Sequence, residues 1–210
     1  MQYWSMTKRP LRGDLLDEIT ARVLDGRLAD RINEVHLARE LGVSRTPLRE
    51  ALIGLADRGL LVAAPGRGFL VAPLDPEEAR RLYPLIAELE ALALRWSPPL
   101  ELATVADALD RLAEEMAEAG TGPELSEMDN RWHALLLSRC GNPHLLRLIE
   151  QTKPLLKRYE SRYLSGPSRV AESIGEHRGI AEALRAGDLP TASALLVRNW
   201  VKALALLERS

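Results

Sequence analysis

Residues 34–52 constrain this chain most, because their pattern predicts two short helices joined by a tight turn. Leu37, Ala38 and Leu41 give the first helix one apolar face. Gly42 follows them, and glycine tolerates the left-handed backbone with which many helices end. The stretch therefore predicts a helix-turn-helix near the start of the chain.

The second helix of this pair predicts contact with DNA. Ser44 or Thr46 can cap it, and Pro47 suits its first turn, where a missing N–H costs nothing. Arg45 and Arg49 lie one turn apart, opposite an apolar face made by Leu48, Ala51, Leu52 and Leu55. A recognition helix places its first side chains on base edges and phosphates of the major groove. We expect Ser44, Arg45, Thr46 and Arg49 to make these contacts.

A β-hairpin is predicted next, with strands at 60–64 and 69–71. Its turn is Pro65-Gly-Arg-Gly, which puts Arg67 at the tip. Gly66 and Gly68 allow the backbone to approach a phosphate or a groove wall closely. A hairpin that only closes a small core is the alternative, but the coordinated arginines favour a DNA-binding wing.

The net charge of −2 is unusual for a protein that binds nucleic acid. Residues 1–75 carry 11 basic and 10 acidic side chains, and the remainder carries 17 and 20. The positive surface must therefore be local, and a dimer would double it. Salt-sensitive but modest non-specific DNA binding follows. The arginines expected in this surface are Arg39, Arg45, Arg49, Arg58 and Arg67.

The composition favours a helical protein, and the length is enough for one or two domains. Hydrophobic residues make up 46% of the 210 residues, but aromatic residues only 4%, which favours helices over sheets. The single cysteine, Cys140, excludes an internal disulfide and fits a reducing cytoplasm. No apolar run approaches the roughly 20 residues of a membrane span. We therefore expect a cytoplasmic protein without a membrane partner.

Two prolines in Ala72-Pro-Leu-Asp-Pro predict a linker between domains at 8–73 and 76–208. The second domain shows helical periodicity throughout, interrupted by Gly and Pro breaks. The predicted fold is mainly α, with an N-terminal winged helix-turn-helix and a C-terminal antiparallel six-helix bundle. The bundle helices are expected at 76–96, 100–119, 123–140, 143–162, 167–186 and 188–208.

Asp129 and His133 have the spacing of a metal-binding pair, since residues four apart share one helix face. His177, which follows Glu176 in a later helix, can join them in the core of a bundle. A carboxylate with imidazoles suits zinc, manganese, nickel or iron. From the spacing alone, an ion pair on the helix surface is the better explanation of Asp129 and His133.

The N-terminal region resembles the winged helix-turn-helix of GntR-family transcriptional regulators. The resemblance rests on Glu34-x-x-Leu-Ala-x-x-Leu-Gly-Val-Ser-Arg-Thr-Pro-Leu-Arg-Glu-Ala-Leu, followed by Gly59-Leu-Leu and Pro65-Gly-Arg-Gly. Two places depart from the family pattern. Ala29-Asp30 stand where the family often has Pro-Gly, and Val35-His36 where it often has an arginine.

Residues 76–208 resemble the FCD effector domain of one branch of these regulators. The matching motifs are Asp129-x-x-Trp-His, Gly141-Asn-Pro-x-Leu and Glu176-His-x-x-Ile-x-x-Ala-Leu-x-x-Gly-Asp. In that family an Asp and three His bind a metal that helps to hold a small carboxylate effector. The resemblance implies Asp129, His133 and His177 as ligands, and it aligns Asn199 with the fourth position.

Zinc is the expected metal, with nickel or manganese as alternatives. The family tends to carry an arginine in the first bundle helix, where this chain has Ile86. Tyr83, Trp132 and Arg162 are expected at the effector site.

The resemblance implies a ligand-responsive transcription factor, most often a repressor. It would bind a short palindromic operator in double-stranded DNA as a homodimer, and a small organic acid would release it. A regulator that senses the metal itself is one alternative. A metal-dependent hydrolase is another, but the sequence shows no glycine-rich phosphate loop, nucleophile motif or separate acid–base pair.

Overall fold

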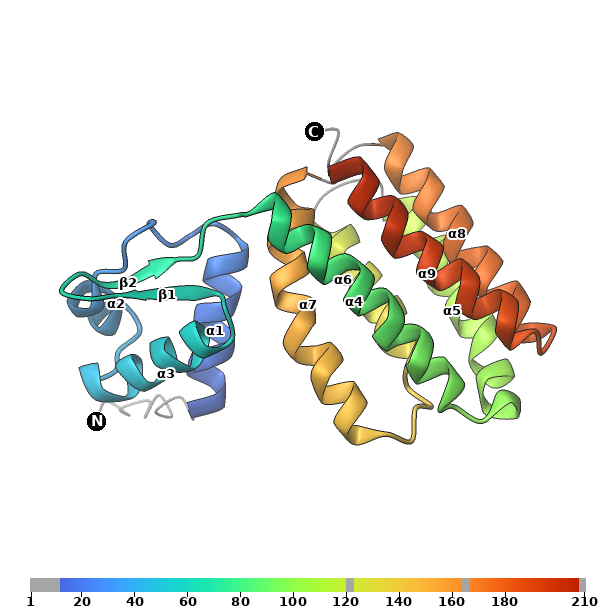
Figure 1. Ribbon diagram of the computed structural model, residues 1–210, viewed down its shortest axis with the longest axis horizontal. Helices are drawn as coiled ribbons and strands as arrows, with labels where there is room; N and C mark the ends of the chain where they lie inside the picture. The colour runs from blue at the N-terminus through green and yellow to red at the C-terminus, as the bar shows by residue number, and fades with distance from the viewer. Residues whose placement is uncertain (1–11, 120–122, 164–166, 208–210) are drawn as a thin grey trace, which may run out of the picture. The chain divides into compact units, whose positions relative to one another are not determined.

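The computed structural model describes residues 12–119, 123–163 and 167–207. The chain divides into two compact units, and the boundary lies between Pro73 and Leu74. The N-terminal unit is a winged helix-turn-helix, as predicted, in which α3 packs against α1, α2 and β1 (Figure 1). Its elements are α1 (Arg12–Leu24), α2 (Glu34–Glu40), α3 (Arg45–Asp57), β1 (Leu61–Ala64) and β2 (Gly68–Val71).

The core of this unit follows the predicted apolar faces. Leu48, Leu52 and Leu55 of α3 are fully buried, as is Ile19 of α1. Burying each such side chain contributes about 1.5–3 kcal/mol. Because these residues share one face of α3, the opposite face of the helix is left to solvent.

The wing is a two-stranded antiparallel hairpin in which Leu61 lies opposite Val71 and Ala64 opposite Gly68. Gly68 has φ of +79°, a backbone conformation that side chains with a Cβ rarely adopt. Phe69 is buried and fixes the hairpin on the core. The structure thus accounts for glycine at this turn by its backbone conformation, and the predicted approach to a phosphate stays a prediction.

The described part of the second unit contains six helices, which confirms the predicted mainly α fold (Figure 1). Helix α4 packs on α7 and α9, α5 packs on α6 and α8, and α8 packs on α9. These helices are α4 (Pro76–Arg95), α5 (Pro99–Ala119), α6 (Pro123–Leu136), α7 (Pro143–Tyr163), α8 (Pro167–Arg185) and α9 (Leu189–Leu207).

The predicted extension of α6 to residue 140 is wrong. The helix ends at Leu136 because the next residues form a tighter turn. The Ser138 N–H bonds the Leu135 carbonyl at 3.1 Å, and the Cys140 N–H bonds the Leu137 carbonyl at 3.0 Å. Bonds to the carbonyl three residues earlier commonly end an α-helix.

Side chains cap the starts of three bundle helices, α4, α7 and α9. Asp75 accepts a hydrogen bond from the Glu77 N–H at 3.0 Å, and Asp188 accepts one from the Thr191 N–H at 3.1 Å. Asn142 accepts from two N–H groups of the first turn of α7. Such caps satisfy N–H groups that have no partner within the helix.

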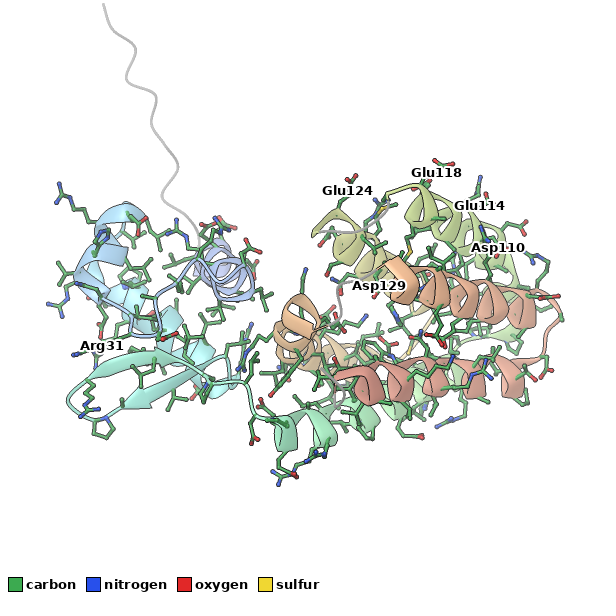
Figure 2. All side chains as sticks on the ribbon, turned by 90° about the horizontal axis from the view of Figure 1, so that it is seen from above. Arg31, Asp110, Glu114, Glu118, Glu124 and Asp129 are labelled. Carbon is green, nitrogen blue, oxygen red and sulfur yellow. The ribbon has the colours of Figure 1, made fainter. Side chains whose placement is uncertain are left out.

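Acidic side chains account for the negative charge of the bundle. Asp110, Glu114 and Glu118 project from α5, and Glu124 projects from α6 (Figure 2). Among the described helices, none is both long and apolar enough to cross a membrane.

A buried hydroxyl joins α7 to the start of α4. The Asp75 N–H donates to the Tyr159 hydroxyl at 3.2 Å, and this hydroxyl also contacts the Asp75 carbonyl and the Glu78 carboxylate. Burial and the contact with Glu78 raise the pKa of Tyr159 to about 12. The first turn after the linker is thus held by a neutral hydroxyl at every physiological pH.

We predict that Tyr159→Phe lowers the free energy of unfolding by about 1–3 kcal/mol, because the loss of the hydroxyl leaves buried polar groups unsatisfied. Urea denaturation measures the change. Thr152→Val is the matched control, since that hydroxyl is exposed and bonds only the Leu148 carbonyl of its own helix. Equal losses in both variants would contradict a specific role for Tyr159.

Candidate DNA-binding face and metal site

The start of α3 is exposed to solvent in the N-terminal unit. Ser44, Arg45 and Thr46 are all exposed, as is Arg39 on α2. Ser44 occupies the N-cap position of α3, but its side chain makes no capping hydrogen bond. Its hydroxyl therefore keeps its donor and acceptor for an outside partner.

Arg49 differs from Arg45 because it has partners within the protein. Its Nη1 lies 3.2 Å from both carboxylate oxygens of Glu34, and its guanidinium lies 5.8 Å from the centre of the Phe69 ring. Among the described residues, no side chain pairs with Arg45. Arg49 thus links α2, α3 and the wing, whereas Arg45 is available to a ligand.

The wing tip presents Arg67 and Gly66 to solvent, next to the half-buried Gly68. A second cation lies beside them that sequence reasoning missed. Arg31 donates from Nε to the Arg67 carbonyl at 3.3 Å, and it is exposed (Figure 2). An isolated bridge between Arg31 and Leu70 of β2 causes this proximity. No periodic pattern in the sequence indicates such a pairing.

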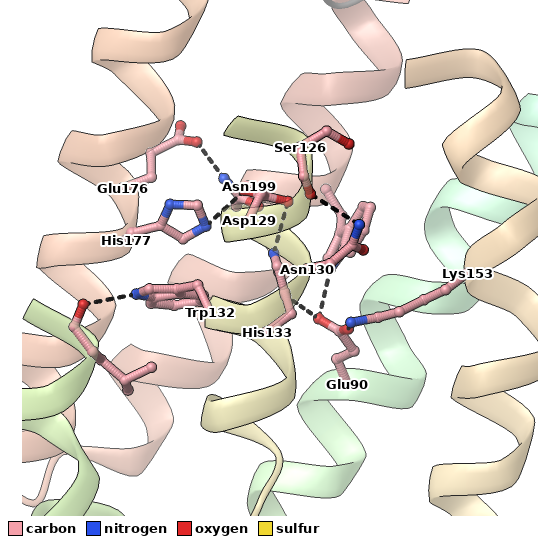
Figure 3. Close-up of polar contacts among 12 residues, drawn as sticks. Glu90, Ser126, Asp129, Asn130, Trp132, His133, Lys153, Glu176, His177 and Asn199 are labelled. Carbon is pink, nitrogen blue, oxygen red and sulfur yellow. Dashed lines mark hydrogen bonds and ion pairs between the residues drawn. The ribbon is translucent and has the colours of Figure 1, made fainter. Parts of the chain in front are cut away.

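The bundle brings together three of the predicted metal ligands. Asp129 and His133 project from α6 and His177 from α8, and one possible ligand atom from each lies within 4.8 Å of the others (Figure 3). Nε2 of His177 is 3.5 Å from Asp129 Oδ1, and Nε2 of His133 is 3.9 Å from Asp129 Oδ2. Both imidazoles are buried.

This donor set fits a divalent metal. Two imidazole nitrogens and one carboxylate oxygen are the ligands of many zinc and nickel sites. Zinc ligands about 2.0–2.1 Å from the ion lie about 3.4 Å apart in a tetrahedron. The separations of 3.5 and 3.9 Å between Asp129 and the two imidazoles are near that value, while the three ligand atoms together lie within 4.8 Å. Three protein ligands would leave coordination positions open.

Asn199 of α9 is buried next to this cluster, and its amide nitrogen is already engaged. Nδ2 donates to Glu176 Oε2 at 2.7 Å, and Lys202 Nζ lies 2.6 Å from the other oxygen of Glu176. The amide oxygen is thus the atom of Asn199 that remains for a metal or a ligand. Its capacity to coordinate is still a prediction.

A fully buried carboxylate, Glu90 of α4, supports the cluster and was missed from the sequence. Its Oε2 lies 2.7 Å from His133 Nδ1 and accepts from Trp200 Nε1 at 2.9 Å, while Lys153 Nζ lies 3.0 Å from Oε1 (Figure 3). Burial alone would raise the pKa of Glu90, but the charges of His133 and Lys153 and the two hydrogen bonds lower it to about 2.

A signal for Glu90 existed in the sequence. It occupies a position of the apolar face of α4 that continues through Tyr83, Ala87 and Leu94. A charged residue at such a position is almost never fully buried unless it is paired. The partners come from other helices, so the spacing could not identify them.

Aromatic rings enclose the imidazoles. Trp132 lies against His177, with ring centres 3.9 Å apart, and donates to the Leu109 carbonyl at 3.1 Å. Trp200 lies 5.0 Å from the His133 ring and 6.1 Å from the Tyr83 ring. Tyr83 and Trp132 are therefore close to the cluster.

Ile86 and Arg162 are the remaining residues for which the family resemblance gave an expectation at the effector site. Ile86 is fully buried, so an apolar side chain stands where the family tends to have an arginine. The side chain of Arg162 lies outside the described residues. Its predicted contact with an effector is therefore not tested.

Glu160 of α7 is a second carboxylate that sequence reasoning missed. Burial raises its pKa to about 7, and the negative charge of Asp129 acts in the same direction. His133, Lys153 and Lys157 act against these effects. The negative charge of Asp129 thus disfavours the ionised form of Glu160.

We predict that Glu160→Gln stabilises the metal-free protein at about pH 8, by on the order of 1–3 kcal/mol. The pKa of Glu160 in the folded protein lies above its ordinary value of 4.5, so wild type loses stability as pH rises from 4.5 to about 7. The difference between the two proteins should shrink toward pH 4.5. Urea denaturation with a chelator present, across this pH range, measures it.

Glu150→Gln is the matched control, since Glu150 is exposed on the same helix. It should change stability little at any of these pH values. A difference between Glu160→Gln and wild type that does not depend on pH would contradict the raised pKa.

Comparison with known proteins agrees with this architecture. The FCD domain model matches residues 81–200, and the model for bacterial regulatory proteins of the gntR family matches residues 11–71. The chain is similar to the uncharacterized HTH-type transcriptional regulator YdhC of Bacillus subtilis (strain 168). The two are 29% identical over 160 residues, which cover 74% of this chain and 71% of that protein.

A second relative is the probable D-xylose utilization operon transcriptional repressor of Paenarthrobacter nicotinovorans. It is 26% identical over 204 residues, which cover 92% of this chain and 87% of that protein. The solved structure of E. coli McbR/YncC has the same fold, with a TM-score of 0.74 at 24% identity over 95% of this chain and 98% of that one. The chain therefore belongs to the GntR family of transcriptional regulators and carries an FCD domain behind its winged helix-turn-helix.

Proposed function

We propose that this regulator binds a short palindromic operator as a homodimer and is released by a small organic acid held in the bundle. One observation carries the proposal, namely that an exposed arginine-bearing helix and a cluster of the half-buried Asp129 with two buried histidines occur in the same chain. Repressors occur among the relatives, which favours repression.

The DNA-binding face consists of the start of α3 and the wing tip. Arg45 reads a base edge, because it is exposed at the N-terminal end of α3 and has no partner among the described residues. Ser44, Thr46, Arg39 and Arg49 contribute contacts around it, and Gly66, Arg67 and Gly68 approach the backbone. Two copies related by two-fold symmetry provide the two half-sites of a palindrome.

The effector site is the Asp129, His133 and His177 cluster. These residues hold a divalent metal, with zinc first and nickel or manganese as alternatives, and the Asn199 oxygen is a weak fourth ligand. A bound metal would supply a positive centre with open positions for an effector carboxylate. Tyr83, Trp132 and Arg162 shape the space around that carboxylate. Effector and DNA then weaken each other's binding by the same factor.

We predict that Arg45→Ala weakens binding to a duplex selected from a random library by the wild-type protein. The loss should be about 1–3 kcal/mol, with relaxed preference at one base pair of each half-site. Fluorescence anisotropy measures the affinity and the number of chains per duplex.

Arg67→Ala should instead weaken binding to all DNA sequences alike and reduce the salt dependence of that binding.

Arg111→Ala is the control for net charge, since Arg111 is exposed on α5 of the bundle. It should leave affinity and specificity unchanged. Wild-type specificity in Arg45→Ala would refute the assignment of Arg45 to a base contact. One chain per palindromic duplex would refute the dimer.

We predict that the protein binds one zinc per chain after reconstitution, and that a His133→Ala/His177→Ala double variant loses this metal. Elemental analysis after gel filtration measures the occupancy. His144→Ala is the matched control, because His144 is exposed at the start of α7. Equal occupancy in the double variant and wild type would refute the site.

The same preparations separate the two regulatory hypotheses. Under the proposal, zinc alone leaves DNA affinity unchanged, and a small organic acid lowers it only in the zinc-loaded protein. Zinc alone lowering the affinity would instead identify a metal-responsive regulator.

A further inference from the structure

We propose that Glu90 is a positioning residue, which holds the proton of His133 on Nδ1 and so turns the lone pair of Nε2 toward Asp129 and His177. No motif of the family resemblance includes Glu90. The inference rests on the proposed metal site, and it adds a residue that sets the strength of that site.

The hydrogen bond decides which ring nitrogen carries the proton. Glu90 Oε2 lies 2.7 Å from His133 Nδ1 and also accepts from Trp200 Nε1 at 2.9 Å. Lys153 Nζ lies 3.0 Å from the other oxygen of Glu90. Because Trp200 Nε1–H and the Lys153 ammonium can only donate, the carboxylate between them is ionised and accepts, so Nδ1 of His133 must be the donor. In neutral His133 the lone pair is then on Nε2.

Nε2 is the ring nitrogen that faces the other ligands. It lies 3.9 Å from Asp129 Oδ2, which is longer than a hydrogen bond. The ring therefore has one nitrogen anchored and the other directed at the cluster (Figure 3). A histidine whose second nitrogen is bonded to a carboxylate binds metals better, since its orientation and tautomer are already set.

Contacts from three other helices fix the carboxylate of Glu90 in place. Its partners come from three other helices, His133 from α6, Lys153 from α7 and Trp200 from α9. Burying the carboxylate of Glu90 without a partner would carry a large desolvation penalty, and the charge of Lys153 offsets it. The Trp200 ring packs 5.0 Å from the imidazole and restricts its rotation.

The first experiment measures the tautomer of His133 in metal-free wild type by ¹⁵N NMR at mildly alkaline pH, with His133→Ala to assign the signals. The expected result is a protonated Nδ1 and an unprotonated Nε2. A proton on Nε2 would overturn the proposal. This readout does not depend on metal binding.

The second experiment compares zinc affinity in Glu90→Met and Glu78→Met by competition with a chelator. Glu90→Met removes the acceptor and should weaken zinc binding about 10–100-fold, with loss of the single tautomer. Glu78→Met is the matched control on the same helix, because Glu78 contacts Tyr159 rather than a histidine. It should retain wild-type zinc affinity and the wild-type tautomer.

Glu90→Gln provides the conservative variant, since its carbonyl oxygen can still accept from Nδ1. It should keep the tautomer and lose less zinc affinity than Glu90→Met. If Glu90→Met does not fold, the wild-type tautomer and Glu90→Gln decide the question. Wild-type zinc affinity with an unchanged tautomer in a folded Glu90→Met would overturn the proposal.

Failure of this inference and failure of the proposed function give different results. A wild-type protein that binds no zinc refutes the metal site, while the tautomer of His133 still tests Glu90. A folded Glu90→Met that keeps both the zinc affinity and the His133 tautomer of wild type refutes the role of Glu90 and leaves the metal site standing.

Discussion

The buried carboxylate of Glu90 is the interaction around which the bundle interior is organised. An ionised group without solvent is tolerated only where partners offset its charge. Here an imidazole, an indole and an ammonium group surround it, each from a different helix. Four helices must therefore stay in register at this point, and the orientation of His133 follows from that register.

Helix α7 connects the interior of the bundle with the segment that follows the linker. Lys153 contacts Glu90, and Tyr159 lies two turns further along the helix and contacts Asp75 at the start of α4. The charge of Asp129 contributes to the raised pKa of Glu160, the next residue. A change of charge at the candidate metal site would therefore act on groups of the same helix that holds the first turn after the linker.

The arginines of the DNA-binding unit fall into two groups, those with partners inside the protein and those exposed to solvent. Arg49 is engaged by Glu34 and the Phe69 ring, so it holds α2, α3 and the wing together. Arg45 and Arg67 are exposed at the two places where a winged helix meets DNA. The weak overall positive charge of this unit is consistent with binding that depends on a few placed cations rather than on a broad basic surface.

Local pattern was sufficient for the fold of this protein, whereas three side chains of its candidate metal site were implied by the resemblance to the FCD domain. Apolar periodicity, caps and Gly–Pro breaks act over a few residues, so the helices, the wing and the Asp129–His133 pair could be predicted from the sequence. The contacts of Glu90, Lys153 and Arg31 could not, because their partners lie on other elements and residue spacing within one helix carries no information about them. Only the tertiary structure decided which buried charges meet, since a carboxylate in the interior is stable only beside partners that the packing of several helices supplies.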